Sequence, residues 1–382
     1  KRIFIVAGES SGDKRASEVV SEIKKDHPEY IFEGLGGQKL AELGVSILFD
    51  LPSVAVVGLT DVLRKYFFFR KIFYMAFNRI KETRPDAVIL VDYPGFNLRL
   101  AAKIKKLGIP VIYYVSPQIW AWANWRVKKI ARIVDKMLVI LPFEVDVYNK
   151  TDLDVEFVGH PLTDSFLPSD SPESIRQELG ITGKEPVISI LAGSRTHEVR
   201  RILPILVRSA ELLFRDKPGA HFLISHSPEL PRELYTQVLA NTPIPYQLVD
   251  RNMHDLIVAS HFCWVTSGTA TLETALGLTP YIITYKASWL TYFLAKHLVT
   301  IPYIGLANII AGKKIIPEFL QYDARPQTIA HETQFILDSP QARAKIIDEL
   351  RAVKERLGHG GAAFRTAKAI ERFLEKGVKN QK

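Results

Sequence analysis

The chain has 382 residues, one cysteine and a formal net charge of +9. That length exceeds what one hydrophobic core usually fills, so two domains are expected. Hydrophobic residues make up 47% and charged residues 24% of the sequence, which excludes a disordered chain. A single cysteine excludes an intrachain disulfide and a cysteine-rich zinc site, and weakly favours a reducing compartment.

The positive charge is either a solubility bias or a sign of an acidic partner, nucleic acid or an anionic lipid surface. No signal peptide and no uncharged apolar run of about 18 residues is seen, so no membrane span is expected.

The first half of the sequence alternates short apolar runs with helical patterns. Each run is almost continuous in apolar residues, which is typical of strands covered on both faces of a parallel sheet. The predicted strands are 3–7, 31–35, 87–91, 111–115 and 137–140, and the helical patterns between them include 16–26, 98–107 and 125–135. The alternation restarts after residue 185, where strands are predicted at 187–191, 221–224, 262–266 and 281–284.

This pattern predicts an α/β protein with two Rossmann-like domains, each built on a parallel sheet. The segment 167–172, LPSDSP, is predicted to link them. We expect domains at 1–166 and 167–340, followed by C-terminal helices over 341–382 that pack back on the N-terminal domain. Ligand sites are expected at the carboxyl ends of the strands.

Two turns of the N-terminal domain carry candidate chemistry. The small residues of GESSGD (8–13) follow the first strand, and a helix N-terminus there can face an anion or a sugar, although an ordinary tight turn explains them better by themselves. Asp92 ends the strand 87–91 and is placed to act as a general base; a turn or helix-capping aspartate is the alternative. Trp120 and Trp122 lie in a later loop, either lining a sugar or acyl pocket or forming a satellite hydrophobic cluster.

The C-terminal domain has two strand–turn–helix segments suited to a nucleotide. Gly193, Ser194 and Arg195 follow one strand and combine close backbone approach, helix N–H donors and a guanidinium fork. The second segment holds Ser267, Gly268 and Thr269, with Glu273 one helical turn further on. A carboxylate there can accept a ribose diol. Together the two segments favour a nucleoside diphosphate over unrelated turns.

The segment 62–81, VLRKYFFFRKIFYMAFNRIK, has more aromatic residues than a core face needs. At 100° per residue the predicted core face is Val62, Tyr66, Phe69, Phe73, Ala76, Phe77 and Ile80. Off that face remain Phe67, Phe68, Tyr74 and Met75, among cations that include Arg64 and Lys71. Surplus aromatics among cations suit the headgroup region of an anionic bilayer, while a neighbouring helix or a partner subunit is the alternative cover. The predicted membrane contacts are Arg64, Phe67, Phe68, Lys71 and Tyr74.

Seven motifs occur together in one order between residue 6 and about residue 320. They are AGESSGD, VDYPGFN, YYVSPQIWAW, LPFE, VGHPLTD, LAGSR and SGTATLE. In this combination the chain resembles the lipid-A-disaccharide synthase family. The resemblance implies a GT-B glycosyltransferase whose active site lies in the cleft between its two domains. It further implies that UDP-2,3-diacylglucosamine and 2,3-diacylglucosamine 1-phosphate (lipid X) are joined into the β-1,6-linked disaccharide 1-phosphate with release of UDP.

The resemblance also assigns roles by position. Asp92 and Arg195 match the family's essential residues, and Glu9, Ser11 and Gly12 match its acceptor-side turn. The nucleotide-side residues that match are Gly193, Ser194, Arg195, Ser267, Gly268, Thr269, Glu273 and Asn308. Residues 1–166 would then bind acceptor and membrane, and residues 167–340 the UDP-sugar. No cofactor or metal is implied, and the family works at the inner face of the cytoplasmic membrane, with homodimers known. The chain departs from the family at Gly95, often an aspartate, and at Lys14-Arg15, usually apolar or small residues.

Two other functions remain open at this point. A UDP-N-acetylglucosamine 2-epimerase shares the fold and the nucleotide, but it has no need of surplus aromatics over 67–75. A basic nucleic-acid-binding protein would account for the charge, but the cations are dispersed and no nucleic-acid-binding motif is recognised.

Overall fold

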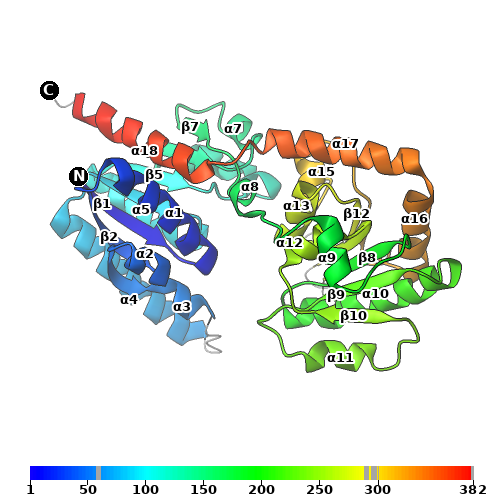
Figure 1. The fold of residues 1–382 in the computed structure, drawn as a ribbon. Coiled ribbons are helices and arrows are strands. Elements are labelled where there is room, and N and C mark those ends of the chain that lie inside the picture. The colour runs from blue at the N-terminus through cyan, green and yellow to red at the C-terminus, as the bar shows by residue number, and fades with distance from the viewer. Residues whose placement is uncertain (57–61, 288–291, 294–298, 300, 380–382) are drawn as a thin grey trace. The chain divides into compact units, whose positions relative to one another are not determined.

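The computed structural model describes residues 1–56, 62–287, 292–293, 299 and 301–379, except for the side chains of 55–56, 62–66 and 377–379. The chain divides into two compact units. The first unit is Lys1–Asp164 with Leu357–Lys382, and the second unit is Ser165–Arg356. Each unit is built on one parallel sheet with helices packed against it (Figure 1). The predicted class, two α/β domains with parallel sheets, is therefore confirmed.

The first unit has a seven-stranded sheet in the order β3-β2-β1-β4-β5-β6-β7. Its strands are β1 (Arg2–Ala7), β2 (Ile31–Gly36), β3 (Ser46–Asp50), β4 (Ala87–Val91), β5 (Val111–Tyr114), β6 (Lys136–Val139) and β7 (Asp154–Phe157). The chain winds outward from β1 in one direction and from β4 in the other. The winding reverses at the carboxyl ends of β1 and β4, which is the switch point where such sheets bind ligands.

Several helices of the first unit, such as α1 (Ser10–Asp26) and α5 (Pro94–Ile104), begin just after a strand. Its other helices are α2 (Gln38–Glu42), α3 (Leu51–Val56), α4 (Val62–Thr83), α6 (Val127–Ala131), α7 (Glu144–Val147) and α18 (Ala362–Lys379), with the 3₁₀ turns η1 (Lys105–Leu107), η2 (Ile119–Ala121) and η3 (Asn124–Arg126). The short α8 (Leu162–Ser165) stands where the chain passes to the second unit. Helix α18 returns to pack against α1.

The second unit repeats the design with six parallel strands in the order β10-β9-β8-β11-β12-β13. They are β8 (Val187–Leu191), β9 (His221–Ser225), β10 (Tyr246–Val249), β11 (Phe262–Thr266), β12 (Tyr281–Tyr285) and β13 (Glu318–Leu320). Its helices include α9 (Pro172–Glu178), α10 (Thr196–Asp216), α11 (Glu233–Leu239), α12 (Met253–Ala259), α13 (Thr269–Leu276), α15 (Leu306–Ala311), α16 (Pro326–Asp338) and α17 (Pro340–Arg356). The winding here reverses between β8 and β11, so the corresponding crevice lies at the ends of those strands.

Helix α4 differs in part from the predicted two-faced helix. Ile72, Ala76 and Ile80 are fully buried, and Phe67 and Tyr74 are 62% and 40% exposed. The expectation that Phe68 and Met75 lie off the core face is wrong, because both are half-buried and packed against the hydrophobic core of the unit. The reason is β3, whose Phe49 meets the ring of Phe68 edge-on at 5.7 Å between centroids. Lys71 is exposed as predicted, whereas the side chain of Arg64 lies outside the described ones.

Candidate functional site

The first crevice brings together two of the segments that the sequence singled out. Ala7 at the end of β1 pairs with Val91 at the end of β4, so the turn after β1 and Asp92 after β4 are neighbours. Gly12 lies in the first turn of α1, and a Cβ on it would be 3.9 Å from both Ala7 and Val91. Glu9 stands at the N-cap position of that helix, and Ser11 is exposed beside it. The predicted acceptor-side turn and the candidate base therefore share one switch point.

Asp92 sits in a strained turn. Its φ is +48° and that of Tyr93 is +47°, a left-handed conformation that is costly for residues with a Cβ. The carbonyl oxygen of Asp92 holds the turn, because it accepts hydrogen bonds from the Tyr113 hydroxyl at 2.7 Å and from the Asn97 amide at 2.8 Å. Such strain persists where the surroundings over-determine it, as these two hydrogen bonds do here.

The electrostatic setting of Asp92 suits a group that exchanges a proton. Burial raises the pKa of its carboxyl above the ordinary value, while the Arg15 guanidinium and the Tyr93 backbone N–H lower that pKa. The Arg15 nitrogen Nη1 lies 3.8 Å from Oδ2 of Asp92. A carboxylate that is partly desolvated but still faces a cation can be ionised near neutral pH and remain more basic than an exposed aspartate.

Asp13, the last residue of GESSGD, has a structural part that the sequence did not reveal. Its two carboxylate oxygens accept the backbone N–H groups of Gly37 at 2.7 Å and Lys39 at 3.1 Å. A carboxylate at the start of α2 satisfies amides that the helix itself cannot. Asp13 therefore fixes α2 against α1 and is not available to a ligand.

The tryptophan loop after β5 divides into an anchored and an exposed part. The Trp120 indole N–H donates to Oε1 of Glu144 at 3.1 Å, and the Leu141 backbone N–H donates to Oε2 at 3.1 Å. Burial raises the pKa of Glu144 to about 7. Trp122, by contrast, is half exposed and has the Arg126 guanidinium 5.9 Å from its ring centroid. Of the two alternatives for this loop, packing therefore describes Trp120, and Trp122 remains at the surface.

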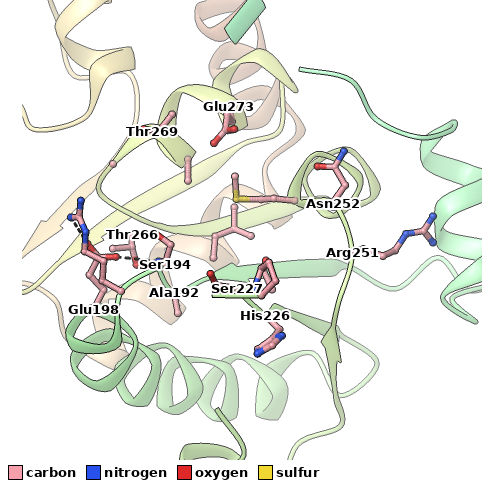
Figure 2. A pocket seen from close by; sticks show the side chains of 18 of the residues that line it. Ala192, Ser194, Glu198, His226, Ser227, Arg251, Asn252, Thr266, Thr269 and Glu273 are labelled. Carbon is pink, nitrogen blue, oxygen red and sulfur yellow. Dashed lines mark hydrogen bonds and ion pairs between the residues drawn. The ribbon is translucent and has the colours of Figure 1, made fainter. Parts of the chain in front are cut away.

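The second crevice opens into a cavity of about 690 Å³. The turns after β8 and β11 both line it, and Figure 2 shows Ser194 and Glu198 on one side with Thr269 and Glu273 on another. Of the predicted nucleotide-side residues it gathers Gly193, Ser194, Arg195, Ser267, Gly268, Thr269 and Glu273. The cavity has the size and the mixture of backbone, hydroxyl and charged groups that small-molecule sites have.

The turn after β8 is shaped by glycine and by one carboxylate. Gly193 has φ +105°, and a Cβ there would come within 2.5 Å of Oε2 of Glu198, so only glycine fits. The same Oε2 accepts the Ser194 N–H at 3.2 Å, and Oε1 lies 3.3 Å from Arg195. The Arg195 side chain is otherwise 72% exposed. The Glu198 carboxylate thus already binds the Ser194 N–H and the Arg195 guanidinium, two donors that an incoming phosphate oxygen could use.

Glu273 is oriented by a histidine that the sequence did not indicate. His254 Nδ1 accepts the Leu167 backbone N–H at 3.3 Å, so its proton is assigned to Nε2, which lies 3.2 Å from Oε1 of Glu273. The cavity lining further includes His226, Arg251 and Asn252, but not His254. These four residues follow β9 and β10 and belong to no recognisable phosphate-binding pattern, and only the order of strands in the sheet could have located them.

Asn308 is placed differently from the other predicted nucleotide-side residues. It does not line the cavity, and its side chain is fully buried. Its amide donates to the Ile316 carbonyl and to Glu318, and its oxygen accepts the N–H groups of Ile315 and Ile316. The side chain holds the turn before β13, and its nucleotide role stays a prediction.

The described residues contain no group of three or more His, Cys, Asp or Glu side chains arranged to hold a metal ion. None of their helices combines the length and the apolar character needed to cross a membrane.

Comparison with known proteins places the chain in a family. The family model of lipid-A-disaccharide synthetase matches residues 3–369. The lipid-A-disaccharide synthase of Anaeromyxobacter dehalogenans (strain 2CP-C) is 42% identical over 370 residues, which cover 97% of this chain and 96% of that protein. The synthase of Myxococcus xanthus (strain DK1622) is 38% identical over 376 residues, 98% of each chain. This chain belongs to the lipid-A-disaccharide synthase family.

Solved structures agree on the fold of this synthase family member. UDP-N-acetylglucosamine 2-epimerase from Neisseria meningitidis, bound to UDP-GlcNAc, matches with a TM-score of 0.62 at 13% identity, covering 98% of this chain and all of that one. Acinetobacter baumannii MurG matches with a TM-score of 0.61 at 13% identity, covering 97% and 99%. At such identities the likeness shows the GT-B fold alone, as the motifs led us to expect.

Proposed function

We propose that this chain is an inverting glycosyltransferase that joins UDP-2,3-diacylglucosamine to 2,3-diacylglucosamine 1-phosphate and releases UDP. The observation that carries the proposal is the 42% identity to a lipid-A-disaccharide synthase over 97% of the chain. The 2-epimerase alternative rests on structural likeness at 13% identity, which does not reach function. A general affinity for nucleic acid has no comparable support.

In the proposed reaction the acceptor hydroxyl displaces UDP from the anomeric carbon in one step. The hydroxyl must lose a proton as it attacks, and Asp92 is the proposed base because it is half-buried at a strand end beside the acceptor-side turn of Glu9, Ser11 and Gly12. One displacement converts an α-linked donor into a β-linked product.

The departing UDP develops negative charge, and the second unit is proposed to bind it. Arg195, Ser194 and the start of α10 would meet the diphosphate, and Ser267, Gly268 and Thr269 at the start of α13 would supply further donors. Glu273, held by His254, would accept the ribose hydroxyls. Each of these groups lines the same cavity except His254, which acts through Glu273.

The proposed site of action is the inner face of the cytoplasmic membrane, with the protein bound peripherally. Support comes from the α4 outer face, which we define as Phe67, Arg70, Lys71 and Tyr74. All four are exposed, and the cations Arg70 and Lys103 lie 5.8 and 5.3 Å from the Tyr74 ring centroid. Aromatics among cations suit the headgroup region of anionic lipid. A homodimer is part of the same family expectation.

The test of the function is an assay of UDP release with the purified full chain. Release should require both lipids together, and mass spectrometry should find the disaccharide 1-phosphate. UDP released equally well with the donor alone would contradict transfer, and a changed sugar without a new glycosidic bond would indicate epimerisation. The Asp92→Asn variant serves as the inactive control.

A further inference from the structure

Arg15 forms an ion pair with the proposed base, and the reaction as described gives it no part. It lies on α1, just past the acceptor-side turn, with its side chain 20% exposed. The 3.8 Å from its Nη1 to Oδ2 of Asp92 is within ion-pair range and too long for a hydrogen bond. The pair is loose, so the guanidinium attracts the carboxylate without committing its donors to it.

Among the groups that shift the pKa of Asp92, Arg15 supplies the positive charge. Among the described residues, Tyr113 on β5 and Glu144 on α7 interact with Asp92 from other elements, and neither becomes positive on ionisation. Arg126 lowers the pKa of Tyr113 but is not among the groups that shift the pKa of Asp92. His160 is close enough to Arg15 to feel its charge, but burial lowers the pKa of His160 to about 3, and its Nδ1 accepts the Leu162 N–H. His160 is therefore neutral at physiological pH. Lys14, the neighbouring cation on α1, is exposed and forms no described pair with Asp92.

The chemistry of the proposed acceptor matches this arrangement, and the inference rests on that proposed function. The acceptor carries its reacting hydroxyl on one side of the sugar ring and a phosphate monoester on the other. When the base holds the hydroxyl, the phosphate is therefore no further from the base than the width of one sugar ring. A phosphate monoester carries between one and two negative charges at neutral pH, and a guanidinium fork is its best protein partner.

We propose that Arg15 binds the phosphate of the acceptor and that, in doing so, it moves from Asp92 to the phosphate. Removal of a neighbouring cation makes a carboxylate more basic. Asp92 thus becomes the stronger base when the correct acceptor is bound, and an acceptor without phosphate leaves the guanidinium on the carboxylate. Arg15 is accordingly a specificity-determining residue that also tunes the base.

The test compares two acceptors, 2,3-diacylglucosamine 1-phosphate and the same lipid without phosphate, at saturating donor. For Arg15→Gln the ratio of kcat/KM between the phosphorylated and the dephosphorylated acceptor should fall about ten- to a hundredfold, mainly through KM, because a charge-assisted pair is lost. Arg15→Lys keeps the charge without the fork and should restore part of the ratio. Lys14→Gln removes the adjacent, exposed cation and should leave the ratio unchanged.

A second readout is the pH profile with the dephosphorylated acceptor, which has no titrating phosphate of its own. Arg15 lowers the pKa of Asp92 in the free protein, so Arg15→Gln should move the acid limb of the rate profile to higher pH. A purely structural effect would lower the rate at every pH and leave the limb in place. Thermal melting shows whether each variant is folded.

Three results separate the hypotheses. An unchanged acceptor ratio in a folded, active Arg15→Gln variant overturns the phosphate assignment. Equal losses on both acceptors with an unmoved acid limb also overturn it, because Arg15 then acts only on the fold. If the unaltered protein releases no UDP with either acceptor, it is the proposed function that fails.

Discussion

Both sheets of this chain have a switch point at the carboxyl ends of two central strands, but different chemical groups follow those strands. At the first switch point, between β1 and β4, the chemistry lies in side-chain charge, with Asp92 facing Arg15. At the second, between β8 and β11, backbone amides and hydroxyls at helix starts lie beside the carboxylates Glu198 and Glu273 and beside Arg195, the more exposed of two guanidinium groups. A base must change its charge during a reaction, whereas a diphosphate brings its charge and needs only donors. Sheet topology decides where a ligand binds, and the residues of the turn decide what it is.

The largest effect is expected from removing the charge of Asp92, which changes the first switch point alone. Asp92→Asn keeps the size of the side chain and should lower turnover by about two to four decades, the usual contribution of a positioned general base. UDP affinity, measured by calorimetry, should be unchanged because the cavity of the second unit contains no part of Asp92.

A matched control stands at the opposite end of the same strand. Asp86 precedes β4 and pairs with Lys1 at 3.1 Å on the surface, far from the carboxyl end where Asp92 lies. Asp86→Asn should leave turnover near that of the unaltered protein. Turnover that survives in Asp92→Asn would place the base elsewhere, and Glu9 is the next candidate.

The second way is to remove Arg195, the more exposed of the two guanidinium groups that line the cavity at the second switch point. Arg195→Ala should weaken UDP binding about ten- to a hundredfold, because hydrogen bonds to charged groups are worth roughly 1.5–3 kcal/mol. Turnover should fall as well, since charge develops on UDP as it leaves. Arg201→Ala, which removes an exposed cation further along α10, is the control and should bind UDP normally. An equal loss in both variants would indicate a general charge effect and not a contact.

A third, smaller effect concerns the ribose end of the cavity. Glu273→Ala should weaken UDP several-fold and leave pyrophosphate binding nearly unchanged, because its proposed partner is the ribose. His254→Ala should do the same to a lesser degree, since His254 acts on the ribose through Glu273, by the 3.2 Å contact. Calorimetric titration with both ligands decides the matter. Equal losses for UDP and pyrophosphate would contradict the ribose assignment.

The sequence predicted the centre of each sheet better than its edges. All nine strands predicted from apolar runs exist, within one or two residues of the observed ends. The four strands that were not predicted, β3, β7, β10 and β13, are the two edges of each sheet. Edge strands are half exposed and mix polar with apolar residues, as in the short segment DVEF of β7. No continuous apolar run marks them, so pairing with a neighbour is what makes them strands.

The same limit applies to the candidate sites. The turns after central strands were predicted because motif and strand end coincide, as at Asp92 and Arg195. Arg15, His254 and Glu144 were not predicted, because each depends on a partner far away in the sequence. Asp13 belongs to a predicted motif, but its structural part needs α2, which is 24 residues away at Gly37. Pair contacts of this kind are set by the tertiary fold and have no local signal.

Helix α4 gives the last and smallest effect, and it tests the predicted faces directly. Phe67 and Tyr74 are exposed, so replacing both by Ser should change the free energy of unfolding by no more than about 0.5 kcal/mol. Phe68 packs on Phe49 and the core, so Phe68→Ser should lower stability by more than about 1 kcal/mol. Thermal and denaturant unfolding measure both variants. The pair separates the outer face of α4 from its packed face.

Binding to vesicles then shows what the outer face is for. Co-sedimentation with anionic vesicles should fall for the Phe67 and Tyr74 double variant, because buried aromatic area is lost, and for Lys71→Gln, because each basic residue near such a surface contributes about 1 kcal/mol. With neutral vesicles, only the loss of the two aromatic side chains should lower binding, and Lys71→Gln should have no effect. Activity on detergent-dispersed lipids should persist in the double variant, while activity on vesicle-embedded lipids should drop. If the double variant instead melts many degrees lower or sediments as a smaller species, these aromatics pack against protein, and a subunit interface would replace the membrane as the partner of α4.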